Sequence, residues 1–167
     1  MAGPVPDMPR IASPLFLTEP EIRHGIELMF FGYGQLTRAV DTTLSEHGIG
    51  RAHSRALYFI GRRPNLSVGE LLTLLAITKQ SLGRVLTELM KRGLVESRPG
   101  DRDRRQRLLR LTPDGAALEG RLFAALSSRM AEAYSRAGQE AVGGFWGVLE
   151  GLVPARDRGK LIGRAGT

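Results

Sequence analysis

The stretch from Ser67 to Thr112 reads SVGELLTLLAITKQSLGRVLTELMKRGLVESRPGDRDRRQRLLRLT and decides the fold of this chain. Its first part, as far as about Leu75, predicts a short amphipathic helix, because leucines recur on one face and a Ser is followed three residues later by a Glu, as in a capping box. After a break, Thr78 predicts the start of a second helix, whose apolar residues recur at helical spacing until Gly93. Two helices joined by a turn of a few residues form a helix-turn-helix.

The end of the same stretch predicts a β-hairpin. Two short strands, at residues 94–98 and 107–111, flank the turn residues Pro99-Gly100-Asp101. From Lys91 to Arg110 there are eight basic and three acidic side chains. Charged groups are costly to bury, so the tip has to lie in solvent or against an anionic partner.

The order helix, helix, Gly-Leu-Val, basic hairpin and Leu-Thr-Pro-Asp-Gly resembles the winged helix-turn-helix of the MarR family of bacterial transcriptional regulators. The wing of that family carries Asp-x-Arg-Asp-x-Arg and then Leu-x-Leu-Thr, which residues 102–105 and 109–112 match. Gly100 stands where the family has its first Asp, which is a departure. The resemblance is most specific over residues 48–115 and extends over 18–153. It implies a mainly α fold with a small β-hairpin wing, that is, a winged helix-turn-helix plus a helical dimerisation region.

The sequence on either side of this lobe indicates how the chain is organised. We expect one long helix from Thr18 to about His47, opened by a capping box, and after the wing a helix that starts at Thr112-Pro113 and another over 139–153. The apolar cluster at residues 15–17 ends the Pro-rich N-terminus. We expect it to pack either on the dimer partner, as the resemblance implies, or on the next helix. The predicted parts are an N-terminal arm (1–17), dimerisation helices (18–47 and 113–153), the DNA-binding lobe (48–112) and a basic tail (154–167).

Composition limits the classes of function. The chain of 167 residues has a formal net charge of +7 and a pI near 10.7, which favours a partner that bears phosphate or is an anionic lipid. A soluble protein from a GC-rich genome, where Arg is frequent, would also carry such a charge. There is no cysteine, which excludes disulfides and thiolate chemistry. The sequence contains no apolar run long enough to span a membrane and no convincing signal peptide, so the cytoplasm is expected.

The resemblance places the DNA contacts on the second helix of the motif and on the wing. The first turns of such a helix enter the major groove, where Gln can read adenine and Arg can read guanine. Arginines at a wing tip fit the narrow minor groove of double-stranded DNA, and arginines on the preceding helix can meet phosphates. By resemblance, Asp103 orients a neighbouring Arg at the tip. The predicted DNA-binding residues are Lys79, Gln80, Ser81, Arg84, Arg102, Arg104, Arg105, Arg51 and Arg55. The alternative for each is an ordinary solvated side chain.

Two further sets of residues follow from the resemblance together with the apolar patterning. Family members bind small aromatic or phenolic effectors between the first helices and the DNA-binding lobe, although an aromatic stripe at helical spacing more often belongs to a core. The last helix contains several glycines and needs a partner for stability. The candidate effector residues are Phe30, Tyr33, Arg51, His53 and Tyr58. The candidate dimer-interface residues are Phe16, Leu17, Ile22, Ile26, Phe145, Trp146 and Leu149.

No pattern in the sequence predicts a metal site, a cofactor or an enzyme. The three histidines have no ligand spacing, and neither G-x-S-x-G nor a phosphate-binding glycine loop is present. The sequence thus predicts a DNA-binding transcriptional regulator, a homodimeric repressor of a pseudopalindromic operator that a small organic ligand releases. Two alternatives stay open: a protein-interaction module that uses the winged-helix surface, and a regulator without small-molecule control. The absence of catalytic motifs disfavours a third, an enzyme on a helical scaffold. Activation in place of repression also stays open.

Overall fold

The structure is a computed structural model that describes residues 17–100 and 103–159. The chain divides into an N-terminal unit, residues 1–35, and a larger unit, residues 36–167. Helix α1 begins at Glu19 and ends at Arg38, so it forms most of the described part of the N-terminal unit. The other elements lie in the larger unit: α2 (Asp41–Glu46), α3 (Arg51–Arg62), β1 (Leu66–Ser67), α4 (Val68–Leu75), α5 (Lys79–Lys91), β2 (Val95–Pro99), β3 (Arg107–Leu111), α6 (Pro113–Ala137), α7 (Gln139–Leu152) and α8 (Ala155–Arg158).

The helix-turn-helix is formed by α4 and α5, and side chains cap both helices as predicted. Ser67 accepts a hydrogen bond on Oγ from the Glu70 amide at 3.2 Å, and the Glu70 carboxylate accepts one from the Ser67 amide at 2.8 Å. Thr78 caps α5 by accepting from the Ser81 amide at 3.1 Å. Between the helices, Ala76 adopts a left-handed conformation with φ 51°, which ends α4 and turns the chain.

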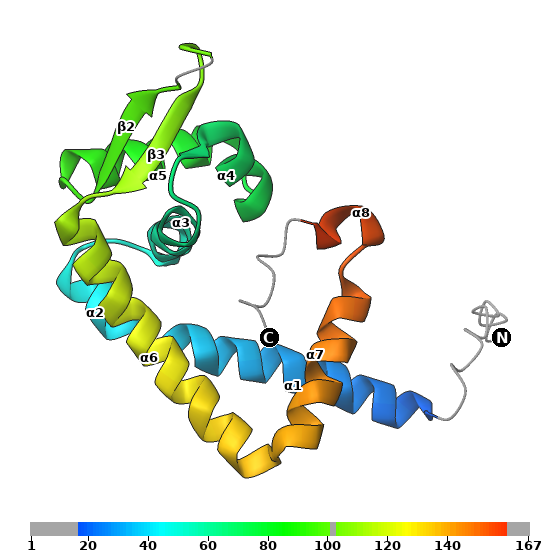
Figure 1. Cartoon of the computed structure of the whole chain (residues 1–167). Helices are drawn as coiled ribbons and strands as arrows, with labels where there is room; N and C mark the ends of the chain where they lie inside the picture. Colours follow the sequence, from blue (N-terminus) through cyan, green and yellow to red (C-terminus); the bar gives the residue numbers. More distant parts are fainter. Residues whose placement is uncertain (1–16, 101–102, 160–167) are drawn as a thin grey trace, which may run out of the picture. The chain divides into compact units, whose positions relative to one another are not determined.

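The wing is part of a three-stranded antiparallel sheet with the order β1-β3-β2. Figure 1 shows its hairpin of β2 and β3. The hairpin of β2 and β3 agrees with the prediction to within one residue, and Ser97 pairs with Leu109 across it. Strand β1 was not predicted, because two residues are too few to display an alternating pattern. It joins the sheet by pairing Leu66 with Leu109, and this pairing attaches the wing to the start of α4.

The core of the larger unit is built mainly from leucines that several elements contribute. Fully buried examples are Leu57 of α3, Leu71 of α4, Leu89 of α5, Leu109 of β3 and Leu118 of α6. Each of these helices turns one apolar stripe inward, and burial of each such side chain stabilises the fold by roughly 1.5–3 kcal/mol before the entropy cost. Helix α6 runs out of this lobe, and after Gly138 α7 leaves in a different direction, so that the two helices form a V (Figure 1).

The prediction of one continuous helix from Thr18 to His47 is wrong. Helix α1 ends at Arg38, and α2 starts at Asp41 after a short turn. In this turn the Ala39 amide donates to the Leu36 carbonyl at 3.2 Å, and the turn lets Val40 and Leu44 enter the core. The apolar spacing continues across the turn, so the sequence pattern could not separate two helices from one.

The chain ends differ in one further respect from the expectation. The basic tail begins with a short helix, α8, which the sequence did not predict.

In residues 17–100 and 103–159, none of the helices combines the length and the apolar character that a bilayer crossing requires. Phe16 and Arg102, together with most of the arm and the last part of the tail, lie outside the described residues.

Candidate nucleic-acid interface

Helix α5 has one buried face and one exposed polar face. Leu82, Val85, Leu86 and Leu89 are buried, as predicted. The opposite face exposes Lys79, Gln80 and Arg84, and within the described part of the chain no hydrogen bond or ion pair engages their side chains. These donors therefore remain available to an external partner. Ser81 differs, because the Thr78 hydroxyl donates to its Oγ at 2.9 Å.

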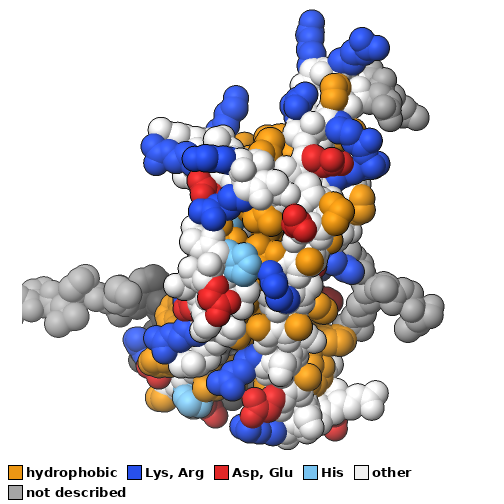
Figure 2. Space-filling model, turned by 90° about the vertical axis from the view of Figure 1, so that its left-hand side faces the viewer, with side chains coloured by type: hydrophobic (Ala, Val, Ile, Leu, Met, Phe, Trp, Pro, Cys, Tyr) orange, Lys and Arg blue, Asp and Glu red, His pale blue; other side chains and the backbone are white. Residues whose placement is uncertain are grey.

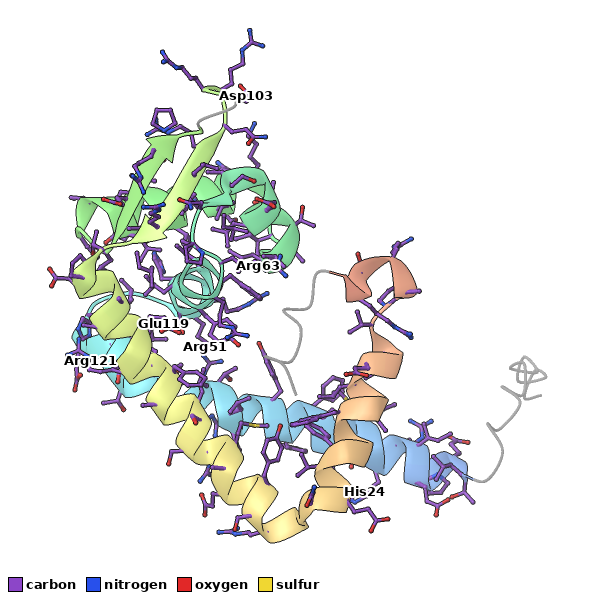
Figure 3. The ribbon with its side chains drawn as sticks, in the orientation of Figure 1. His24, Arg51, Arg63, Asp103, Glu119 and Arg121 are labelled. Carbon is purple, nitrogen blue, oxygen red and sulfur yellow. The ribbon has the colours of Figure 1, made fainter. Side chains whose placement is uncertain are left out.

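The wing tip is held in shape by backbone contacts. The Gly100 amide donates to the Gln106 carbonyl at 2.9 Å, and the Gln106 amide donates to the Asp103 carbonyl at 3.0 Å. The Asp103 carboxylate accepts from the Arg105 amide at 2.9 Å, so it shapes the backbone of the tip (Figure 3). Asp103 thus positions Arg105 through its main chain, a more specific role than the resemblance implied.

Gly100 explains the departure from the family pattern at this turn. A Cβ atom on residue 100 would lie 2.8 Å from the Asp103 carbonyl oxygen, which is closer than real Cβ contacts allow. An Asp at this position would therefore require the backbone at Asp103 or at residue 100 to shift.

The arginines of the tip are well placed to meet an anionic partner. Arg104 and Arg105 are both exposed. Lys and Arg side chains gather at the wing end of the molecule, at the top of the space-filling view (Figure 2). Arg107, at the start of β3, instead donates from Nε to the Ser97 hydroxyl at 3.0 Å and so links the two strands. Arg102 of the predicted set lies outside the described residues.

The two arginines predicted on α3 have partners within the chain. Arg51 forms a bidentate pair with Asp41, with Nε–Oδ1 at 2.9 Å and Nη2–Oδ2 at 2.7 Å. This hydrogen bonding lowers the pKa of Asp41 and joins α2 to α3. Arg55 donates from Nη2 to the Leu75 carbonyl at 3.1 Å and satisfies the end of α4. The sequence reasoning missed both contacts, since no local pattern links these pairs.

The candidate effector residues lie on two helices. Phe30 and Tyr33 are exposed on α1, while His53 and Tyr58 lie on α3. His53 Nδ1 accepts from the Gly50 amide at 3.1 Å at the start of α3, and partial burial lowers the pKa of its ring. Tyr58 lines a shallow apolar depression whose other lining residues on α6 include Phe123, Leu126, Met130 and Tyr134. The effector site itself stays a prediction.

The candidate dimer residues also lie on two helices. Leu17, Ile22 and Ile26 precede or belong to α1, and Phe145, Trp146 and Leu149 belong to α7. Trp146 donates from Nε1 to the Tyr134 hydroxyl at 2.9 Å, and their rings meet edge to face at a centroid distance of 6.0 Å. Trp146 therefore also fastens α7 to α6. Phe145 exposes 42% of its surface and Val148 62%, so α7 keeps an uncovered apolar face.

The parts of the chain that the structure describes contain no group of three or more His, Cys, Asp or Glu side chains arranged to hold a metal ion.

Comparisons with known proteins agree with this arrangement. A family model described as MarR family matches residues 47–106. The HTH-type transcriptional regulator PetP of Rhodobacter capsulatus is 52% identical over 145 residues, which cover 86% of this chain and 87% of PetP. Both names denote transcriptional regulators, which are not a class of enzyme.

Solved structures share the fold. A mutant MarR from E. coli, complexed with operator DNA, superposes with a TM-score of 0.65 at 24% identity, covering 80% of this chain and 96% of that one. A MarR family protein from Mycobacterium tuberculosis, in complex with p-aminosalicylic acid, superposes with a TM-score of 0.56 at 25% identity, covering 75% and 95%. The chain belongs to the MarR family of transcriptional regulators and has a winged helix-turn-helix fold.

Proposed function

We propose that this regulator binds double-stranded DNA sequence-specifically, as a homodimeric repressor of a pseudopalindromic operator, in the cytoplasm. The observation that carries the proposal is the exposed face of α5, where Lys79, Gln80 and Arg84 have no partner among the described residues. Gln and Arg are the side chains that read adenine and guanine through paired hydrogen bonds. The fold of this chain is shared by a MarR that was solved with operator DNA, which supports the same use of the surface here.

Arginines on the wing would add contacts with the minor groove to the base contacts of α5. Arg104 and Arg105 extend from a tip that Gly100 and Asp103 hold in a tight turn. Guanidinium groups are attracted to the negative potential of a narrow minor groove. In this proposal α5 specifies the sequence and the wing adds affinity beside it.

A homodimer is supported by the exposed apolar side chains of α7. Phe145, Val148 and Leu152 of α7 are exposed, and scattered glycines make this helix weak unless something packs on it. A two-fold dimer would present two copies of α5 to successive major grooves, about one helical turn apart.

A small organic effector is the proposed signal for release. One relative with this fold was solved with p-aminosalicylic acid, an aromatic acid. An effector acts only if it favours a dimer geometry that does not fit the operator. Indifference to every small molecule tried would favour a regulator controlled by its own abundance.

The test starts with recovery of bound duplexes from a randomised pool. We expect a pseudopalindromic consensus, and an affinity that falls steeply between 50 mM and 200 mM salt, as counterion release from several phosphate contacts requires. Sedimentation then gives the oligomeric state, and a panel of aromatic acids tests release. Recovery of no consensus and no salt-dependent binding would instead support a protein-interaction module that uses the same surface.

A further inference from the structure

Arg92, the first residue after α5, connects this helix to a turn elsewhere in the larger unit. Its Nη1 donates to the His47 carbonyl at 2.7 Å and its Nη2 to the Gly48 carbonyl at 3.1 Å. Its Nε donates to the Glu88 carboxylate, one turn back on α5, at 2.6 Å. The ion pair with Glu88 aims the guanidinium group, and the two carbonyls fix where it lies.

The turn between α2 and α3 presents the carbonyl groups that accept these hydrogen bonds. Gly48 has φ +58°, its amide donates to the Ser45 carbonyl at 3.0 Å, and the Ile49 amide donates to the Leu44 carbonyl at 3.0 Å. The carbonyls of His47 and Gly48 follow the end of the helix, where a helix leaves acceptors without intrahelical donors. Arg92 supplies donors to both.

The same turn is also attached to α6. His47 Nδ1 lies 2.8 Å from the Thr43 carbonyl, which can only accept, so this nitrogen carries the proton. The other ring nitrogen, Nε2, is therefore the acceptor for Arg121 Nη2 at 3.0 Å. Figure 3 shows Arg121 on α6 beside α2. The turn thus forms a junction among α2, α5 and α6.

A second attachment holds the chain that leaves α5. Gly93 turns the chain with φ +68°, and the Leu94 amide donates to the Leu89 carbonyl at 2.9 Å. The Leu94 carbonyl then accepts from the Thr112 amide at 3.1 Å, at the start of α6. The C-terminal end of α5 is therefore fixed on one side by Arg92 and on the other by the base of the wing.

We propose that Arg92 is a positioning residue for DNA recognition: without contacting DNA, it sets the tilt of α5 within the DNA-binding lobe. The proposal rests on the proposed DNA-binding function. Helix α5 has 13 residues and is thus about 20 Å long, so a tilt of about 5° at Arg92 displaces its first turn by about 1.7 Å. Hydrogen bonds tolerate only a few tenths of an ångström, so this displacement would break base contacts made by the first turn.

The rival role for Arg92 is a direct contact with a DNA phosphate. The two roles differ in what salt reveals. A lost phosphate contact lowers the affinity for every duplex and reduces the slope of log K against log salt by about 0.9. A tilted helix keeps its phosphate-binding charges, so the slope and the affinity for a nonspecific duplex stay unchanged while operator affinity falls.

The experiment titrates the selected operator and a scrambled duplex with the full chain, over a range of salt concentrations. We expect Arg92→Gln to lower operator affinity by roughly tenfold or more, the scale of a lost base contact, with no change for the scrambled duplex. Arg92→Lys keeps the charge and one donor, so it should recover part of the loss. Arg121→Gln, which leaves Arg92 intact but detaches His47 from α6, should lower operator affinity in the same selective way. Thermal melts of each variant confirm that it is folded.

Two outcomes overturn the proposal. An Arg92→Gln chain that binds both duplexes less tightly with a reduced salt slope identifies Arg92 as a phosphate contact. Unchanged operator affinity in Arg92→Gln shows that Arg92 does not position α5, whatever the effect of Arg121→Gln. If the wild-type chain binds no duplex, the proposed function itself fails, and this result is distinct because it requires no variant.

Discussion

The carbonyl oxygen of Leu94 occupies the space that a side chain on residue 115 would need. An ideal Cβ atom at Gly115 would lie 1.9 Å from this oxygen, so the first turn of α6 and the base of the wing are in direct backbone contact. Thr112 strengthens this contact, because its hydroxyl donates to the Gly93 carbonyl at 2.6 Å and accepts from the Gly115 amide at 3.0 Å. The junction between α5, the wing and α6 therefore depends on a glycine.

Gly115→Ala should destabilise the fold by roughly 1–3 kcal/mol or more, because backbone would have to shift to admit one methyl group. Denaturant unfolding measures this free energy. Gly120→Ala is the matched control in the same helix, since nothing lies within 4 Å of its Cβ position. The control should gain about 0.5–1 kcal/mol from helix propensity. Equal stability of the two variants would show that the wing base can move away from α6.

Gly83→Ala should separate stability from DNA binding. Gly83 lies in the middle of α5 on its exposed face, and nothing in the described structure lies within 4 Å of its Cβ position. Alanine should therefore raise the free energy of unfolding by about 0.5–1 kcal/mol. If Gly83 lets the helix backbone approach the bases closely, the same variant should bind operator less tightly. A more stable variant with unchanged affinity would remove the close-approach role.

His53 should make stability depend on pH in the weakly acidic range. Burial lowers the pKa of its ring below the ordinary value of 6.5. The unfolded chain then binds more protons than the folded chain as pH falls, so the free energy of unfolding decreases from about pH 7 towards pH 5. His53→Gln should flatten this part of the profile. An unchanged profile in His53→Gln would assign the pH dependence to other groups.

Glu119 should have the opposite dependence. This carboxylate lies on α6 where the helix faces α3 (Figure 3), and burial raises its pKa above the ordinary 4.5 despite the nearby Arg62. As pH rises from about 4.5, the folded chain therefore keeps the Glu119 proton longer than the unfolded chain does, and the free energy of unfolding decreases. Glu119→Gln should raise the melting temperature at pH 7 and have a smaller effect near pH 4. A lower melting temperature at both pH values would show that the Arg62 interaction outweighs burial.

Features that depend on neighbours in sequence could be predicted from it. The caps at Ser67, Thr78 and Thr112 use residues three positions apart, and the buried leucines of α5 recur at helical spacing. These signals were sufficient for the helix-turn-helix and the wing hairpin. The exposed face of α5 follows from the same spacing, because the residues left after the apolar stripe must face outwards.

Features that depend on distant parts of the chain could not be predicted in this way. Arg92 meets the turn at His47 across 45 positions, and Arg121 meets His47 across 74, so no local pattern indicates either contact. Arg51 carried two predicted roles, and its pairing with Asp41 depends on the turn that separates α2 from α1. Because the apolar spacing continues through this turn, neither the end of α1 nor the Arg51–Asp41 ion pair could be predicted from the sequence.

The most direct test of sequence reading by α5 is a titration of the selected operator and of the same duplex with its half-site bases exchanged, using the wild-type chain and Arg84→Ala. The account predicts that the wild type prefers the operator, and that Arg84→Ala loses roughly 1–3 kcal/mol of this preference while its affinity for the exchanged duplex changes little. A wild-type chain that binds both duplexes equally, or an Arg84→Ala chain that weakens on both to the same extent, would contradict base recognition by α5.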